Sequence, residues 1–462
     1  MTISRRQFAM GGASLAAFAG LSRFASVAAA TSYHNQVPGY GPLRDDPAGL
    51  IDLPHGFSYR VISSAGDMMD DGLTVPCCHD GMGCFALDAD RVVLVRNHEL
   101  LPDQRARGAK GLISLAYDRY ADGGALPGGT SNIVYNLRSG RVERQHLSLA
   151  GTIRNCSGGV MPWGSWLSCE EILTRAGEDG IARDHGLAFE VPANARGLVE
   201  PAPIHALGRF NHEGAVIDPR TGILYLTEDE KDSLFYRFLP DRPGALHQGG
   251  RLQALGFIEQ PEGGDSRNWK RRDMAVGDMR LTRWIDLHGV DNPHNDLKNR
   301  GHADGAAIFA RGEGIYFGDG QVHFMCTSGG AAGLGQIFRY IPSPFEGQAR
   351  EKDEPGRLSL FVESDDRQVL NYGDNITVAP WGHLIICEDN KTPFADNMLR
   401  GVTQGGRVYT LGRIRGGTEP TGACFSPDGR VLFLNIYAPG KTLAVSGPWE
   451  RVVQAGSPDF AA

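Results

Sequence analysis

The fold of this chain is best approached from NCSGGVMPWGSWLSCEE, the stretch at residues 155–171. It joins a glycine-rich loop with one thiol to an apolar run that ends in two carboxylates. A related string, PWGHLIICED, occupies residues 380–389, and it repeats the Trp, Gly, Cys and Glu of the first when the prolines are aligned. This match within one chain indicates an internal repeat of a glycine turn, an apolar strand and a polar strand end.

Shorter segments elsewhere follow the same order, with a polar residue six or seven positions after the turn. Repeats at this spacing are typical of propeller blades, in which equivalent strand ends converge on one channel. We therefore predict an all-β fold: a six-bladed β-propeller with loop insertions and a metal site in its central channel. The high glycine content, 62 of 462 residues, agrees with many turns between short strands. The predicted strand ends are Asn97, Glu170 with Glu171, Glu228 with Asp229, Asp319, Glu388 with Asp389, and Asn435.

The beginning of the sequence predicts an export signal. Residues 4–8 read SRRQF, a twin-arginine signature, and an apolar run leads to the AAA of residues 28–30, which offers a cleavage site. We predict that residues 1–30 are a twin-arginine signal peptide and that residues 31–462 form a single β-propeller domain. An uncleaved anchor is the alternative, but the run is short and rich in Ala and Gly. The expected location is periplasmic or extracellular, through the twin-arginine export machinery, with no membrane attachment after cleavage.

The charge balance limits the possible partners. The chain carries a formal charge of −8, and its leader holds three arginines and no acid, so the remaining chain is more acidic still. This argues against binding to nucleic acid and favours a protein that collects cations. We expect a monomer.

The eight cysteines do not form an obvious disulfide framework. Cys169 and Cys387 end apolar runs, where a thiol packs as a small hydrophobic group. Cys77, Cys78 and Cys84 lie close in sequence, but their spacing matches no common zinc pattern. Cys156 differs, because its glycine loop cannot bury it by itself.

The adjacent carboxylates indicate a cation site. Neighbouring residues on a strand face opposite sides, so one acid of each pair can point into the channel. Two like charges about 4 Å apart repel by about 4 kcal/mol at an effective dielectric of 20, so several acids together need bound cations. Oxygen ligands favour Ca²⁺, whereas a thiolate among them favours iron or zinc. Arg154 is the best-placed cation for an anionic substrate, although a structural salt bridge is an alternative for it.

Four motifs resemble the PhoX-type alkaline phosphatases. They are NCSGG at 155–159, PWGSWLSCEE at 162–171, GRFNHEGA at 208–215 and YLTEDE at 225–230. The twin-arginine leader fits as well, and the similarity runs through most of the chain. The resemblance implies a six-bladed propeller whose cavity holds Fe³⁺ and Ca²⁺ ions, with a cysteine bridging two irons, and which hydrolyses phosphate monoesters. It implies that Cys156 is that bridge and that Glu213 and the strand-end acids are metal ligands.

We therefore predict an exported phosphatase that acts on a small phosphorylated substrate. Alternatives are a calcium-dependent propeller lactonase or phosphodiesterase, and a non-catalytic propeller braced by cations. The predicted catalytic residues are Arg154, Asn155 and Cys156. The predicted metal ligands are Cys156, Asn97, Glu99, Glu171, Glu213, Glu228, Asp229, Glu388 and Asp389.

Overall fold

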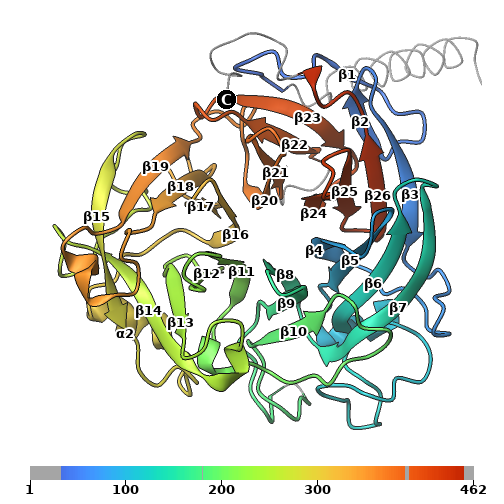
Figure 1. Cartoon of the computed structure of the whole chain (residues 1–462), viewed down its shortest axis with the longest axis horizontal. Coiled ribbons are helices and arrows are strands. Elements are labelled where there is room, and N and C mark those ends of the chain that lie inside the picture. Colours follow the sequence, from blue (N-terminus) through green and yellow to red (C-terminus); the bar gives the residue numbers. More distant parts are fainter. Residues whose placement is uncertain (1–32, 179, 391–394, 452–462) are drawn as a thin grey trace, which may run out of the picture.

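The computed structural model describes residues 33–178, 180–390 and 395–451, and the predicted signal peptide at 1–30 lies outside these residues. The described chain is mostly β-structure in a propeller-like arrangement, with antiparallel sheets placed around a central axis (Figure 1). No helix in the described part of the chain is long and apolar enough to cross a membrane.

Five sheets make up this arrangement. Two of them have four strands: β4 (His79–Ala86), β5 (Arg91–His98), β6 (Gly128–Asn136) and β7 (Arg141–Thr152) in one, and β24 (Pro420–Phe425), β25 (Val431–Ile436), β26 (Lys441–Ser446) and β3 (Ser58–Ser64) in the other. A third has three strands: β8 (Asn155–Met161), β9 (Ser165–Glu170) and β10 (Ala188–Pro192).

The remaining two sheets are larger. One has six strands: β1 (Leu43–Arg44), β2 (Ile51–Pro54), β23 (Val408–Ile414), β22 (Asn397–Val402), β21 (Leu384–Glu388) and β20 (Gly373–Val378). The other has nine: β11 (His212–Ile217), β12 (Leu224–Glu228), β13 (Tyr236–Pro240), β14 (Gly250–Phe257), β15 (Met279–Asp286), β19 (Arg357–Glu363), β18 (Gln336–Ile341), β17 (Gln321–Cys326) and β16 (Gly312–Gly318).

The helical segments in the described residues are short and lie in connections between strands. They are η1 (Pro102–Arg107), η2 (His205–Leu207), η3 (Leu246–Gln248), α2 (Leu297–Ala303) and η4 (Ala349–Lys352).

The inner strands, β4, β8, β11, β16, β20 and β24, form a closed ring in which each contacts the next around the axis. Figure 1 shows this ring around the centre of the molecule. Each inner strand pairs with a second strand further out: β5, β9, β12, β17, β21 or β25. The ring closes where the early strand β3 pairs antiparallel with β26 near the end of the described chain. Strands distant in sequence are therefore held around one axis.

Apolar side chains fill the space between neighbouring sheets. Between the β11 end and the β16 end of the nine-stranded sheet, the rings of Phe235 and Phe324 stack with centroids 4.3 Å apart. Phe338 and Tyr340 are fully buried in the same cluster. This packing removes apolar surface from water, which stabilises the folded state by about 25 cal/mol for each Å² buried. It also keeps the inner strands at fixed positions.

One predicted strand has a different place. The sequence predicts that the run after Gly312 is an apolar strand with its polar end, Asp319, at the channel. In the structure Gly312–Gly318 is the inner strand β16, and Asp319 lies in the following turn with a φ of 51°. The matching second strand is β17, Gln321–Cys326. The apolar pattern alone could not distinguish the two strands of this hairpin, because both are partly apolar.

Candidate metal centre

One end of the central channel forms a cavity of ≈ 310 Å³ lined mainly by charged side chains. We call it the acidic cavity. Among the described residues, nine carboxylates line it against two guanidinium groups. The lining residues are Asp80, Glu99, Leu101, Gln104, Arg154, Cys156, Glu171, Glu213, Asp229, Arg311, Glu313, Asp374, Asp389, Glu419, Thr421 and Tyr437.

The first set of these side chains comes from the second residue of each inner strand. A strand alternates its side chains, so a ligand aimed into a channel needs a local change in the backbone. Every inner strand has such a change, because its pairing with the second strand shifts register at this residue or directly after it. A bulge of this kind bends the strand and redirects a side chain. The six residues are Asp80, Cys156, Glu213, Glu313, Asp374 and Thr421.

The second set follows the ends of the second strands. Glu171, Asp229 and Asp389 each come one residue after β9, β12 and β21, and each lines the cavity. Glu99 holds the same position after β5, and Tyr437 after β25. The chain leaves its strand at these points, so the side chains are free of the sheet and reach the channel.

The structure separates the two acids of each pair. Glu228 is buried away from the cavity and accepts a hydrogen bond of 2.7 Å from the Tyr236 hydroxyl. Glu388 accepts one of 2.7 Å from Arg400 Nε. Of these predicted ligands, Asp229 and Asp389 therefore lie at the cavity, whereas Glu228 and Glu388 pair with groups inside their own sheets.

Three further residues of the prediction, all asparagines, do not line the cavity. Asn97 Nδ2 donates to the carbonyl oxygens of Cys156 at 3.2 Å and Ser157 at 2.6 Å. Asn435 Nδ2 donates in the same way to the carbonyl of Asp80 at 2.6 Å. Asn155 Nδ2 donates to Ser168 Oγ at 2.9 Å and stays inside its sheet. The amides of Asn97 and Asn435 thus hold the backbone that carries the cavity residues.

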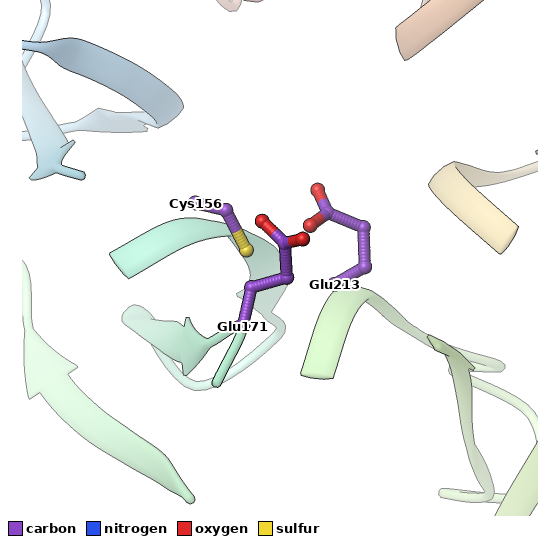
Figure 2. Close-up of side chains that lie close together, drawn as sticks. All are labelled: Cys156, Glu171 and Glu213. Atoms are coloured by element: carbon purple, nitrogen blue, oxygen red, sulfur yellow. The ribbon is translucent and has the colours of Figure 1, made fainter. Parts of the chain in front are cut away.

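Among the described residues, seven of the cavity's side chains form three groups, each with ligand atoms within 4.8 Å of one another. Figure 2 shows the first group, in which Cys156, Glu171 and Glu213 point toward one another. Neighbouring groups share a carboxylate, because Glu213 belongs to the first and second and Asp374 to the second and third. The three groups are Cys156 with Glu171 and Glu213, Glu213 with Glu313 and Asp374, and Asp374 with Asp389 and Glu419.

Burial raises the pKa of four of these acids, Glu171, Glu213, Glu313 and Glu419, well above their usual range. For Glu213 burial is the main cause, and the nearby charges of Glu313 and Asp374 raise its pKa further. Burial likewise dominates the raised pKa of Asp80 and of Glu419. The charged forms of these side chains are therefore costly in the buried cavity unless a positive charge lies beside them. A bound divalent or trivalent ion removes this cost, so the donor set of the cavity fits metal ions.

Two arginines lie at the cavity wall, each directly before an inner strand. Arg154 bonds Glu99 through Nε at 3.1 Å and Glu171 through Nη2 at 2.9 Å. Arg311 Nη2 bonds Asp229 at 2.6 Å and Glu313 at 2.8 Å. Both residues have a left-handed backbone, with φ of 50° and 55°. Such a conformation costs energy for a non-glycine residue and is common at functional sites.

Sequence reasoning missed Asp80, Glu313, Asp374, Glu419 and Arg311. One signal could have found two of them, because Asp80 and Glu313, like Glu213, are each followed by glycine. The glycines are needed where inner strands crowd around the axis.

A Cβ added to Gly81 would lie 2.6 Å from Ser157 Cα, and one added to Gly314 would lie 2.6 Å from the Ile376 nitrogen. An acid followed by glycine at the start of a strand is thus the local signature of this cavity. Glu419 precedes its strand and has no such signature.

Comparisons with known proteins bear on the family and the fold of this chain. The family model described as alkaline phosphatase PhoX matches residues 38–136 and 126–440. Among solved structures, Pseudomonas fluorescens PhoX in complex with vanadate, a transition state analogue, aligns with a TM-score of 0.65 and 18% identity over 90% of this chain and 98% of that chain. This likeness shows the fold.

Other solved structures align less closely, and curated proteins add no relative. The Xanthomonas campestris gluconolactonase XC5397 aligns with a TM-score of 0.37 and 14% identity over 90% of this chain and 100% of that one. No curated protein matches.

Proposed function

The chain belongs to the PhoX family of alkaline phosphatases, and from this membership we propose that it hydrolyses phosphate monoesters with calcium and iron ions held in the acidic cavity. One observation carries the proposal. Nine carboxylates and one thiol face a single buried cavity in which only two guanidinium groups balance them. Such an excess of negative charge is stable only with bound cations. Cations in turn give the cavity affinity for a phosphate group.

The donor types suggest which ions each group takes. Cys156 with Glu171 and Glu213 combines a thiol with carboxylates, a set that suits iron. The two groups that contain only carboxylates suit Ca²⁺, which prefers oxygen ligands. The shared residues Glu213 and Asp374 would bridge neighbouring ions.

The chain's own residues then bind and orient the ester. When bound, the ions polarise the phosphoryl oxygens and neutralise the charge that develops on them. Arg154 and Arg311 supply guanidinium groups that can hold two phosphate oxygens each. Their salt bridges to the cavity acids restrict their motion, so little entropy is lost when the substrate binds.

Neutral groups complete the rim of the cavity. Leu101 and Gln104, at the start of η1, line it together with Tyr437. Burial is the main cause that raises the pKa of Tyr437 above its usual value, so its hydroxyl keeps a proton that it can donate in a hydrogen bond. These residues limit the access of bulk water, and the volume of ≈ 310 Å³ favours a small phosphorylated substrate.

We also propose that the propeller has six blades, one for each inner strand. In this count the nine-stranded sheet consists of two blades that β15 joins, because β15 pairs with β14 on one side and with β19 on the other. The register shift that recurs in all six inner strands supports the count. An experimental structure with an inner ring of any other number would contradict it.

The test combines metal analysis with an activity assay. Protein purified with its native metals should contain iron and calcium by mass spectrometry and should hydrolyse p-nitrophenyl phosphate at alkaline pH. The Cys156→Ser variant should lose iron and most of the activity, whereas Cys84→Ser, on the same ring but outside the cavity, should retain both. Calcium without iron, or full activity in Cys156→Ser, would contradict the assigned cluster.

Export by the twin-arginine pathway remains part of the proposal. The motif SRRQF at residues 4–8 supports it, and a protein that folds around metals suits a pathway that carries folded cargo. Replacing Arg5 and Arg6 by Lys should retain the protein in the cytoplasm in a cell-fractionation assay, and unchanged export would contradict the proposal.

A further inference from the structure

Two adjacent thiols lie beside the acidic cavity and have no part in the proposed reaction. Cys77 and Cys78 directly precede the inner strand β4, and both are buried, with exposures of 9% and 0%. Cys78 has a left-handed φ of 52° and occupies the same position before its strand as Arg154 and Arg311 do before theirs. The internal repeat therefore places a cysteine pair directly before β4, the strand that carries the cavity residue Asp80.

The surroundings hold Cys77 firmly and favour its thiolate. Arg107 Nη2 lies 3.3 Å from Cys77 Sγ, and the Arg107 carbonyl accepts the Cys77 amide at 2.8 Å. The pKa of Cys77 falls to about 6, first because the Cys78 thiol hydrogen-bonds to it and then because of Arg107, while burial opposes both. A low pKa beside a guanidinium is the usual environment of a reactive cysteine.

Cys78 connects this pair to the cavity. Its carbonyl accepts the Glu99 amide at 3.0 Å, and Glu99 is the cavity acid that binds Arg154. The Cys78 side chain packs with Tyr437, which lines the cavity. The second thiol is therefore positioned against Cys77 on one side and the cavity rim on the other.

We propose that Cys77 and Cys78 form a thiol–disulfide site that takes oxidising equivalents from a small-molecule disulfide and closes to a bond between the adjacent residues. The Cys77 thiolate attacks one sulfur of the small disulfide, whose S–S bond breaks and releases one thiol. Cys78 then gives up its proton and attacks Cys77 Sγ, which releases the second thiol. The cysteine pair loses two electrons and two protons, and the small disulfide is reduced to two thiols.

A disulfide between neighbouring residues is strained, and strained disulfides are reduced more readily. Cys78 also has a left-handed backbone conformation, which is costly for a non-glycine residue. The pair is therefore suited to reversible oxidation, and this inference stands independently of the proposed phosphatase reaction.

Peptide mapping of the metal-loaded protein tests the inference. The protein is incubated with defined ratios of oxidised to reduced glutathione, the free thiols are alkylated, and the digest is analysed by mass spectrometry. We expect an intramolecular Cys77–Cys78 bond to appear before any of the other six cysteines is modified. Alkylation of both residues at every ratio, or a lasting mixed disulfide with glutathione, would overturn the inference.

A matched pair of arginine variants tests the role of Arg107. Arg107→Gln removes the guanidinium beside Cys77 and should slow oxidation at neutral pH by roughly threefold to tenfold. Arg105 lies in the same helix but contacts Asp122 instead of a cysteine, so Arg105→Gln should leave the oxidation rate unchanged. Equal rates in the two variants would refute the activation by Arg107. If Arg107→Gln fails to fold, the wild-type peptide map still decides the inference.

Discussion

At the scale of single residues, the acidic cavity depends on which atom each side chain can reach. Glu228 and Asp229 are chemically similar neighbours, but only Asp229 faces the channel, because Glu228 is the last residue of its strand and pairs with Tyr236. The position of the Arg154 guanidinium likewise depends on its local backbone. Its left-handed backbone directs the guanidinium between Glu99 and Glu171 rather than into the sheet.

Replacing Arg154 by Gln should lower kcat/KM for p-nitrophenyl phosphate by roughly 100-fold, because a charge-assisted contact to the phosphate is lost. Steady-state kinetics measures this. Arg220→Gln is the control, since Arg220 is half-exposed and pairs with Asp218 at a turn. A loss of activity equal in both variants would show that Arg154 has no specific role.

At the scale of elements, the repeated register shift and the glycines of the inner strands are the decisive features. Each shift directs one side chain to the axis, and glycines allow neighbouring inner strands to pass closely. A hydrogen bond between sheets adds to this order, as Asn97 of β5 holds the backbone of β8. The site is therefore built by equivalent parts of all the inner strands.

Gly314→Ala tests the close approach of inner strands. The added Cβ would lie 2.6 Å from the Ile376 nitrogen and 2.7 Å from the Asp374 carbonyl oxygen, so β16 and β20 must separate. Overpacking of this kind should lower the free energy of unfolding by about 1–3 kcal/mol and weaken metal binding at Asp374. Chemical denaturation measures the first effect. Gly197→Ala, with no atom within 4 Å of the added Cβ, should be neutral.

A buried His–carboxylate pair behind the cavity predicts a pH dependence of stability. His185 Nδ1 lies 2.6 Å from Glu170 Oε1, and its side chain has 0% exposure. Burial acts to lower the pKa of His185, but Glu170 and Asp118 outweigh it and raise the pKa to about 9. Because the folded pKa exceeds the unfolded one, the stabilisation is complete below about pH 6.5 and is lost as pH rises through 9.

The His185→Gln variant should therefore be less stable than the wild type by on the order of 3 kcal/mol at pH 6 and by much less at pH 10. Urea unfolding at a series of pH values measures the difference. His247→Gln is the control. His247 is half-exposed, and its Nε2 lies 3.9 Å from Glu190 Oε2, which is too far for a strong ion pair. This variant should show no such trend with pH. A constant difference for His185→Gln across this range would exclude the ion pair as its cause.

At the scale of the whole molecule, the ring brings residues distant in sequence into one cavity. Asp80 and Glu419 come from β4 and from the residue before β24, at opposite ends of the chain, and meet because these strands are neighbours in the closed ring. Metal ions that bind here would connect several sheets at once. The cavity should therefore contribute to global stability as well as to catalysis.

Removal of the metals should destabilise the folded protein. A chelator that strips the cavity should lower Tm by on the order of 5 °C, because the carboxylates then repel one another and binding to the folded state is lost. Calorimetry measures the shift, and added Ca²⁺ should restore most of it while Na⁺ should not. An unchanged Tm after complete metal removal, checked by elemental analysis, would show that the ions do not brace the ring.

Local patterns in the sequence determined the strand repeats, the propeller-like arrangement and part of the cavity. The alternation of turn, apolar run and polar end predicted the strands β9, β12 and β21, which Glu171, Asp229 and Asp389 directly follow. These features are readable because each depends on a short segment and on the physical chemistry of burial and turns. The prediction of a glycine loop around Cys156 was wrong, because residues Asn155–Met161 form the inner strand β8. The family resemblance followed from the same motifs and is confirmed by the family model.

The tertiary structure alone decided which acids share the cavity. Whether Glu228 or Asp229 faces the channel depends on the residue at which the strand ends and on the nearby Tyr236, and neither is encoded in the pair itself. Asp80, Asp374 and Glu419 enter the site because register shifts and ring closure act over the whole molecule. The periodicity of a single strand contains no information about the register shifts or the ring closure, because both arise from contacts with other strands of the fold.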